Sequence, residues 1–364
     1  MKALCVGGAM IDTIAIIESS AIERMELLNA GTSFLLLEEG RKTEALEVST
    51  HCGGGAINTA VALARLGVTC SVLIKLGADL RAEQILARLA DEGISVSWVS
   101  RDSRAPTGAS VHVSSHDRNA AVFTFRGANT LLAPPDLHDG AFEVDLVYIA
   151  NLSNEAATCF PLIVEKAKRA RALVAANPGL RQLHAHGDAF KETLPHLDIL
   201  ALNRREAEEV LILLDAPRSD ESAPLTYPTN VRLPPLAECG LKHEGRRMSV
   251  RNFLRALMDR GVGSVVLTDG RDGAFAASGD RMIYCPAHEA EVAGTAGAGD
   301  AFASTFSAYL ADGGDAEAAI RAATINAAGV LQHVDTQTGL MRRADLEKFL
   351  SSKKSIPNVI GWPL

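Results

Sequence analysis

The chain has 364 residues, of which 47% are hydrophobic, so it can bury a large core as one domain or as one domain with a smaller attachment. Its formal net charge of −8 argues against a general nucleic-acid binder, because no basic surface is available to neutralise phosphates. The six cysteines form no C-x-x-C pair, and no apolar run could span a bilayer. We therefore expect a cytoplasmic protein with free thiols, no secretory signal and no membrane partner.

Short apolar runs without polar alternation are interpreted as buried strands. They cover residues 3–8, 145–151, 172–176, 197–202 and 264–270. Helical patterns lie between them, over residues 56–66, 82–92, 154–172 and 204–214. This alternation predicts an α/β fold with a mostly parallel central sheet and helices on both faces. Ligands bind such sheets beyond the carboxyl ends of the strands.

Three stretches depart from this alternation. Residues 13–52 and 107–127 contain short runs with alternating polar positions, which predict a small antiparallel β-sheet lid beside the main sheet. Residues 216–247 are rich in proline and charge and predict a surface insertion without assigned chemistry. We expect a single domain over residues 1–364 that carries both features.

The sequence AGTAGAGDAF, at residues 293–302, leads into a helical pattern. Gly297 to Gly299 would lie at the helix N-terminus, where exposed backbone N–H groups favour an anion. Glycines let a phosphate approach the backbone, and Asp300 in the first turn could accept a proton beside it. A phosphotransferase needs this combination of a bound phosphate and a neighbouring proton acceptor. The alternative is an ordinary turn whose aspartate is stabilised by the helix dipole by roughly 0.3 to 1 kcal/mol.

A second glycine run, HCGGGAIN at residues 51–58, also precedes a helical pattern. It fits neither the P-loop nor the dinucleotide-binding fingerprint. It could be a plain tight turn, or it could offer backbone N–H groups and the Asn58 amide to a polar ligand. Asp12 is a lone carboxylate in an apolar run, and a polyhydroxyl ligand would compensate for the cost of burying it.

Together these motifs resemble the PfkB, or ribokinase-like, family of sugar and nucleoside kinases. Gly7, Gly8 and Asp12 are similar to the opening of the family, residues 53–67 to its first signature and residues 293–310 to its second. Segments in the family's order lie between them, at 75–95, 125–129, 176–178, 203–207 and 265–275. The resemblance covers nearly the whole chain apart from 216–247, and it implies a ribokinase-like fold.

The resemblance implies a role for each matching residue. Asp300 matches the catalytic base that deprotonates the acceptor hydroxyl as it attacks the γ-phosphorus of ATP, and the backbone of Gly297, Ala298 and Gly299 matches the anion hole. Glu206, with Asn203, matches the N-x-x-E motif that organises Mg²⁺ and the phosphates, mostly through water. The matching acceptor-binding residues are Asp12, Gly53, Gly54 and Asn58, with Arg126 and Asn129 as additions, and the nucleotide-binding residues are Asn203, Thr268, Gly270, Gly273 and Asn326.

Some of these residues also fit a structural role. Asn203 and Glu206 fit a helix capping box, and Asn326 fits a satisfied helix asparagine. Two positions depart from the family. Gly294 replaces an aspartate that often helps to bind a monovalent cation, so dependence on K⁺ stays open. Gly55 replaces a lysine of some ribokinase-type members, so ribose specificity is not implied.

The sequence thus predicts an ATP-dependent kinase that phosphorylates a hydroxyl of a small sugar. A nucleoside kinase is the alternative, favoured if aromatic lid residues such as Phe34, Phe123 and Phe125 stack on a base. A non-catalytic sugar- or nucleotide-binding protein is a third. Lid strands in this family often pair between subunits, so the resemblance also implies a homodimer.

Overall fold

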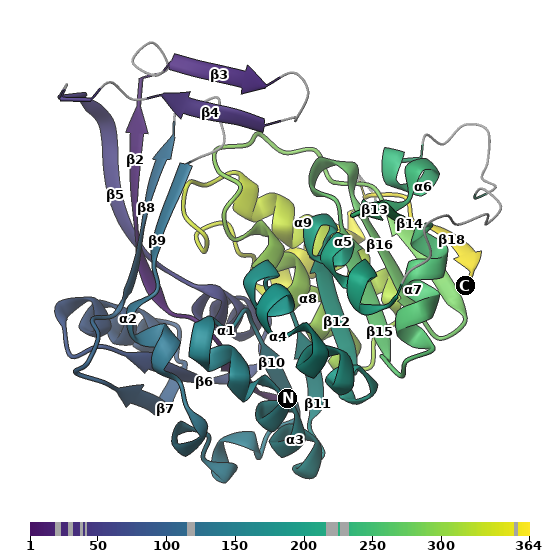
Figure 1. The fold of residues 1–364 in the computed structure, drawn as a ribbon, viewed down its shortest axis with the longest axis horizontal. Helices are drawn as coiled ribbons and strands as arrows, with labels where there is room; N and C mark the ends of the chain where they lie inside the picture. Colours follow the sequence, from purple (N-terminus) through teal and green to yellow (C-terminus); the bar gives the residue numbers. More distant parts are fainter. Residues whose placement is uncertain are drawn as a thin grey trace.

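A ten-stranded sheet forms the centre of the protein (Figure 1). The computed structural model describes residues 1–18, 23–27, 32–36, 39–40, 42–114, 121–215, 225, 233–352 and 356–364. In spatial order the strands are β18 (Ile360–Pro363), β17 (Arg281–Cys285), β16 (Ala274–Ser278), β15 (Ser264–Thr268), β12 (Ile199–Asn203), β11 (Leu173–Ala176), β10 (Leu146–Ile149), β1 (Lys2–Val6), β6 (Thr69–Leu76) and β7 (Ser95–Arg101). All pairs from β7 to β15 are parallel, and β16 to β18 add an antiparallel edge.

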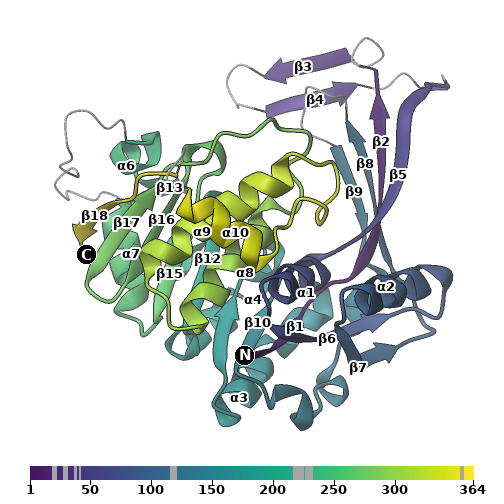
Figure 2. The ribbon, with the colours of Figure 1, turned by 180° about the vertical axis from the view of Figure 1, so that it is seen from behind.

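Helices cover both faces of this sheet, as the sequence predicts (Figures 1 and 2). One face packs against α1 (Gly55–Arg65), α2 (Leu80–Asp91), α8 (Ala298–Ala311), α9 (Ala316–Leu331) and α10 (Arg343–Ser351). The other packs against α3 (Phe160–Arg169), α4 (Leu180–Thr193), α5 (Arg204–Leu213) and α7 (Val250–Met258). The two apolar layers explain why the strands are apolar without alternation. None of the described helices is long and apolar enough to cross a membrane.

The helix predicted over 154–172 is shorter than expected. Residues Asn154–Cys159 form a 3₁₀ helix, and α3 begins only at Phe160. Pro161 lies in the first turn of α3, where its missing N–H costs no helical hydrogen bond. The proline therefore marks the start of the α-helix.

The lid is a separate four-stranded sheet with the order β5 (Ala45–Gly53), β2 (Met10–Ile17), β8 (Gly108–Ser114) and β9 (Ala121–Phe125). The prediction of an antiparallel sheet is wrong in one pair, because β2 and β8 run parallel. Both strands start at the same end of the lid, where Met10 pairs with Gly108, and run away from the main sheet. A hairpin of β3 (Glu23–Leu27) and β4 (Thr32–Leu36) lies at the far end of the lid (Figure 1).

The predicted insertion at 216–247 is described only in part, since residues 216–224 and 226–232 lie outside the described residues. The remainder contains α6 (Pro235–Cys239), β13 (Leu241–His243) and β14 (Arg246–Met248). Leu236 and Leu241 are fully buried in the same core as α5 and α7. The part that contains α6, β13 and β14 therefore belongs to the core of the fold. The prediction that residues 216–247 as a whole form a surface insertion stays a prediction.

Candidate active site

The two glycine runs meet at Asp300. Asn58 on α1 donates a hydrogen bond from Nδ2 to Oδ2 of Asp300 on α8, with a distance of 2.7 Å. A Cβ atom on Gly55 would lie 3.9 Å from Oδ1 of Asp300. Two helix N-termini thus converge on one carboxylate.

Glycine is required at the residue that precedes each helix. Gly54 has a φ of +97°, and a Cβ atom there would lie 2.6 Å from the carbonyl oxygen of Gly8. Gly297 has a φ of +79°, and its Cβ atom would lie 2.6 Å from Cβ of Thr336. Gly299 differs, because no described atom lies within 4 Å of the place of its Cβ atom. The start of α8 therefore offers open space beside N–H groups that could bind an anion.

Asp300 is half-buried and has an unusual protonation equilibrium. Burial raises its pKa above the ordinary value, and the negative charge of Asp12 raises it further. The hydrogen bond from Asn58 opposes both effects, because it stabilises the charged carboxylate. The net rise makes Asp300 a stronger base than an exposed aspartate.

Asp12 lies on the inner face of the lid, the face that carries Asp12, Ser110 and Thr124 in register across β2, β8 and β9. Asp12 is 5% exposed, and Ser110 donates a hydrogen bond to its carboxylate. His112 lies 2.7 Å from the Ser110 hydroxyl through Nε2. A Cβ atom on Gly53 would lie 1.9 Å from Oδ2 of Asp12, so the carboxylate rests directly against the first glycine run.

Sequence reasoning missed Ser110 and His112. Their spacing of two on one strand was the available signal, since alternate residues share a face. This spacing alone did not identify a site, because the sequence does not show which strand pairs with β8.

The second group of predicted residues lies at the carboxyl ends of β12 and β15. Asn203 and Thr268 are register partners across these strands. Asn203 caps α5 by accepting from the Glu206 N–H at 3.0 Å, and Glu206 accepts from the Asn203 N–H at 2.8 Å. Gly270 and Gly273 form the turn after β15 with φ values of +56° and +88°. The capping box is therefore present, whether or not these residues also bind a ligand.

Glu206 is a buried carboxylate with a strongly shifted pKa. Burial raises the pKa to about 7, helped by the charge of Asp300 and opposed by the hydrogen bonds from Asn203. No basic side chain pairs with Glu206 among the residues that the structure describes. A cation at this position would stabilise the charged form of Glu206.

Three other predicted residues bond within the protein. The Asn129 amide pairs with the backbone N–H and carbonyl of Ala9, at 2.9 and 2.8 Å. Arg126 donates to the Ser153 hydroxyl at 2.6 Å. Asn326 is fully buried, donates to Thr305 and accepts from the Met341 N–H, both at 2.8 Å. The prediction that Asn326 contacts the nucleotide therefore meets a physical obstacle, because its amide has no accessible surface and is already paired.

Both departures from the family pattern have a steric reason. A Cβ atom on Gly294 would lie 2.9 Å from the carbonyl oxygen of His333, which leaves no room for an aspartate. A Cβ atom on Gly55 would lie 2.8 Å from Cβ of Ala150. Neither position can carry a longer side chain unless the neighbouring segment moves.

Known proteins are similar to this chain over most of its length. The family described as "pfkB family carbohydrate kinase" matches residues 2–225 and 236–343. A deoxyribokinase from Salmonella typhi is 27% identical over 342 residues, which are 93% of this chain and 98% of that protein. A ribokinase from Bacillus subtilis is 24% identical over 303 residues, which are 82% of this chain and 87% of that protein.

Solved structures share the fold. A ribokinase from Thermotoga maritima has a TM-score of 0.71 at 20% identity, over 97% of this chain and 100% of that one. An Arabidopsis thaliana ribokinase complexed with ribose and ATP has a TM-score of 0.71 at 21% identity, over 96% and 98%. A Burkholderia thailandensis nucleoside kinase in complex with inosine has a TM-score of 0.70 at 18% identity, over 98% and 100%. The predicted ribokinase-like fold is confirmed.

Proposed function

The chain belongs to the pfkB family of carbohydrate kinases, and we propose that it transfers the γ-phosphoryl group of ATP to a hydroxyl of a small sugar, with Asp300 as general base. One observation carries this proposal. The Asp300 carboxylate is held by Asn58 at the meeting point of two glycine-led helix N-termini, with Asp12 nearby. The arrangement pairs a base with backbone N–H donors for a phosphoryl group.

The chemistry assigned to this chain is positioning and electrostatics. Asp300 accepts the proton of the acceptor hydroxyl while that oxygen attacks the phosphorus. Backbone N–H groups of Gly297, Ala298 and Gly299 stabilise the charge on the transferred group. No covalent enzyme intermediate is needed, because phosphoryl transfer is accelerated mainly by alignment and charge stabilisation.

A sugar is favoured over a nucleoside as the acceptor because the polar side chains of the lid lie on its inner face and two aromatic ones on its outer face. The inner face presents Asp12, Ser110 and His112, which suit a polyhydroxyl ligand. Phe123 and Phe125 alternate with Thr124, so they lie on the opposite face, where they are 63% and 52% exposed. These two rings are therefore directed away from the position of a base stacked over Asp12. A nucleoside kinase remains the second candidate.

The donor is proposed to be Mg·ATP, bound at the carboxyl ends of β12 and β15 by Asn203, Thr268, Gly270 and Gly273. Glu206 would hold the Mg²⁺ of the nucleotide through water, and its buried carboxylate, which has no basic partner among the described residues, suits a cation. Magnesium supplies charge neutralisation of the phosphates when bound. Gly294 provides neither a carboxylate nor room for one, so the proposal leaves dependence on K⁺ open.

The test is ADP release with Mg·ATP against a panel of sugars, sugar acids and nucleosides, for the wild type and Asp300→Asn. We expect activity on a sugar that falls by about 10²–10⁴-fold in the variant, with ATP binding unchanged. Asp345→Asn is the matched control, because Asp345 is also a first-turn aspartate but is exposed on α10, away from the site. Undiminished turnover by Asp300→Asn would disprove the base assignment, and a nucleoside as the best acceptor would support the second candidate.

We also propose that the protein is a homodimer formed through the outer face of the lid. Val48, Val111, Phe123 and Phe125 lie on this face by the register of the sheet, and each is between 44% and 63% exposed. An apolar surface of this kind on a sheet is typical of a protein interface.

A further inference from the structure

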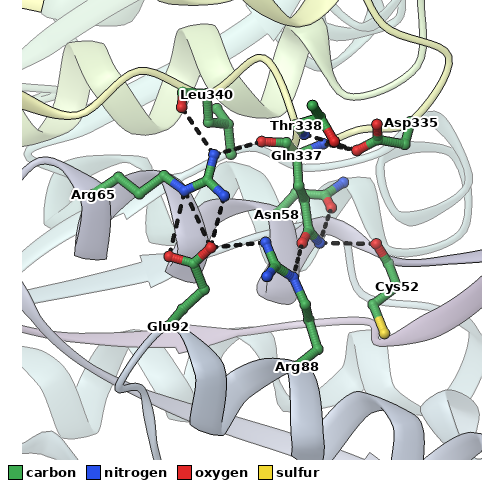
Figure 3. A network of polar contacts seen from close by, with 9 residues as sticks. All are labelled: Cys52, Asn58, Arg65, Arg88, Glu92, Asp335, Gln337, Thr338 and Leu340. Atoms are coloured by element: carbon green, nitrogen blue, oxygen red, sulfur yellow. Dashed lines mark hydrogen bonds and ion pairs between the residues drawn. The ribbon is translucent and has the colours of Figure 1, made fainter. Parts of the chain in front are cut away.

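A network of polar side chains and backbone groups contacts Asn58 on the side away from Asp300. Figure 3 shows Asn58 with most of this network. The Asn58 side chain is 4% exposed, and its Oδ1 accepts two hydrogen bonds. One comes from the Thr336 hydroxyl at 2.8 Å and the other from Nε2 of Gln337 at 3.2 Å. Both donors belong to the loop after α9, which is remote in sequence from α1. The amide of Asn58 is thus held on one side by this loop and on the other by Asp300.

The direction of the Asn58 amide follows from the chemistry of these donors. An asparagine amide fits equally well after a half-turn that exchanges its oxygen and nitrogen. The Thr336 hydroxyl tolerates both arrangements, since it can donate or accept. Gln337 Nε2 can only donate, so it requires the oxygen of Asn58 to face it. The nitrogen of Asn58 must then face Asp300.

Gln337 is itself oriented by groups that have a single role. Its Oε1 accepts from Nε of Arg88 at 2.9 Å, and a guanidinium cannot accept. Its Nε2 also donates to the carbonyl oxygen of Cys52 at 2.8 Å, which cannot donate. Both ends of the Gln337 amide therefore select the same orientation.

Arg88 and the loop are held in turn by partly buried charged groups (Figure 3). Glu92 accepts from Arg88 at 2.8 Å and from Arg65 at 2.7 Å. Arg65 also donates to the carbonyl oxygens of Gln337 and Leu340, at 2.8 and 2.9 Å. Gln337 is 4% exposed, so water does not compete for its amide. The order of the network runs from the Arg65–Glu92–Arg88 group to Gln337, then to Asn58 and Asp300.

We infer that Gln337, oriented by Arg88, is a positioning residue that keeps the N–H of Asn58 on the Asp300 carboxylate. It touches neither Asp300 nor the space of the acceptor, and it acts through Asn58 alone. This inference deepens the proposed function and rests on Asp300 being the base. If the Asn58 amide turned, its oxygen would face the carboxylate, and the repulsion would favour protonated, inactive Asp300.

The test is the pH dependence of kcat in Gln337→Glu. Glutamate has the same shape and still accepts from Arg88, but it offers no donor to Asn58. We expect the acid limb of its kcat profile to move up by about one pH unit, so that kcat falls by about 10-fold on that limb and much less at higher pH, with KM for ATP unchanged. Among the residues that the structure describes, the titratable groups that face Asp300 are Asp12 on β2, Glu206 on α5 and Tyr148 on β10, and the variant alters none of them.

Two controls separate positioning from charge and folding. Gln332→Glu adds the same charge to the same part of the chain, but Gln332 is exposed and its side chain donates to the Ala328 carbonyl, so its profile should match the wild type. Arg88→Lys keeps a donor for Gln337 and should retain activity, whereas Arg88→Met should shift the profile as Gln337→Glu does. This second pair provides the same test if Gln337→Glu fails to fold.

A wild-type pH profile and kcat in Gln337→Glu, or equal profiles for Arg88→Lys and Arg88→Met, would overturn the inference. Asp300→Asn is measured in the same assay to keep the two proposals apart. If Asp300→Asn is active, the proposed base is wrong. If it is inactive while Gln337→Glu behaves as wild type, only the positioning role is wrong.

Discussion

Asp300 and Glu206 are two carboxylates whose charges oppose each other in the folded protein. Each lies in a poorly solvated position, and the charge of Asp300 contributes to the raised pKa of Glu206. Such pairs are costly for stability and occur where a site must later bind a cation or hold a proton. We expect substitution of one member to increase stability and decrease activity.

The substitution Glu206→Gln tests this cost. The pKa of Glu206 is about 7 in the folded protein against 4.5 for an ordinary glutamate, so its contribution to stability is present below pH 4.5 and is lost as the pH rises through 7. Above pH 7 the loss is on the order of 3 kcal/mol. Glutamine can still accept from the Asn203 N–H. We expect the variant to have a higher free energy of unfolding than the wild type at pH 8, and a much smaller gain at pH 5.

Urea unfolding at the two pH values measures the difference, and ADP release measures the accompanying loss of activity. Glu208→Gln is the control, because Glu208 is on the same helix but pairs with Arg204 at the surface. A gain for Glu206→Gln that is equal at pH 5 and pH 8 would contradict the electrostatic origin of the cost.

At the scale of elements, the start of α8 is packed on the loop after α9. Gly297 caps α8 in the left-handed region and lies against Thr336, the neighbour of Gln337. Asp335 fixes this loop by accepting from the N–H groups of Gln337 and Thr338, each at 2.8 Å. The proposed anion hole and the network behind Asn58 are therefore supported by one loop.

Gly297→Ala tests this dependence. A side chain there meets both a positive φ and a contact of 2.6 Å with Thr336, so we expect a loss of more than about 2 kcal/mol in stability and of most activity. Gly313→Ala is the matched control at the other end of α8, with a φ of +83° and no atom within 4 Å. It should cost about 1 kcal/mol and leave activity unchanged. Equal effects of the two variants on thermal unfolding and ADP release would refute the role of the Thr336 contact.

At the scale of the whole molecule, the lid is a sheet with two unlike faces. The inner face carries Asp12, Ser110 and His112 toward the glycine runs, and the outer face is apolar and exposed. The lid strand β2 begins at Met10, shortly after the main-sheet strand β1 ends at Val6. A short turn therefore joins the lid, which carries Asp12, to the main sheet. Pairing of two lids would stabilise both acceptor sites.

Phe123→Asp tests the proposed dimer. We expect the wild type to sediment as a dimer and the variant as a monomer, because a carboxylate cannot be buried in an apolar interface without a partner. Leu80→Asp is the control, since Leu80 is 81% exposed on α2 and does not belong to the outer face of the lid sheet. A wild type that sediments only as a monomer would end the proposal. A monomeric variant with an elevated KM for the sugar would further link the lid contact to acceptor binding.

The sequence by itself determined the parts of this protein that depend on neighbouring residues. Buried strands appear as apolar runs, and the helix starts at Gly54 and Gly297 appear as glycine runs because a positive φ is a local requirement. The Asn203–Glu206 capping box is likewise a spacing of three. The candidate base Asp300 could be predicted for the same reason, since its position in the first turn of a helix follows from the glycine run just before it.

Only the tertiary structure decided which of these local features face one another. The bond between Asn58 and Asp300 joins residues 242 positions apart, and Gln337 reaches Asn58 across 279. The parallel pairing of β2 with β8, and the burial of Asn326, likewise depend on how distant segments pack. Hydrophobic periodicity encodes which face of an element is buried, but not against which partner, because many partners bury apolar area equally well. The polar network behind Asp300 is therefore evident only in the folded chain.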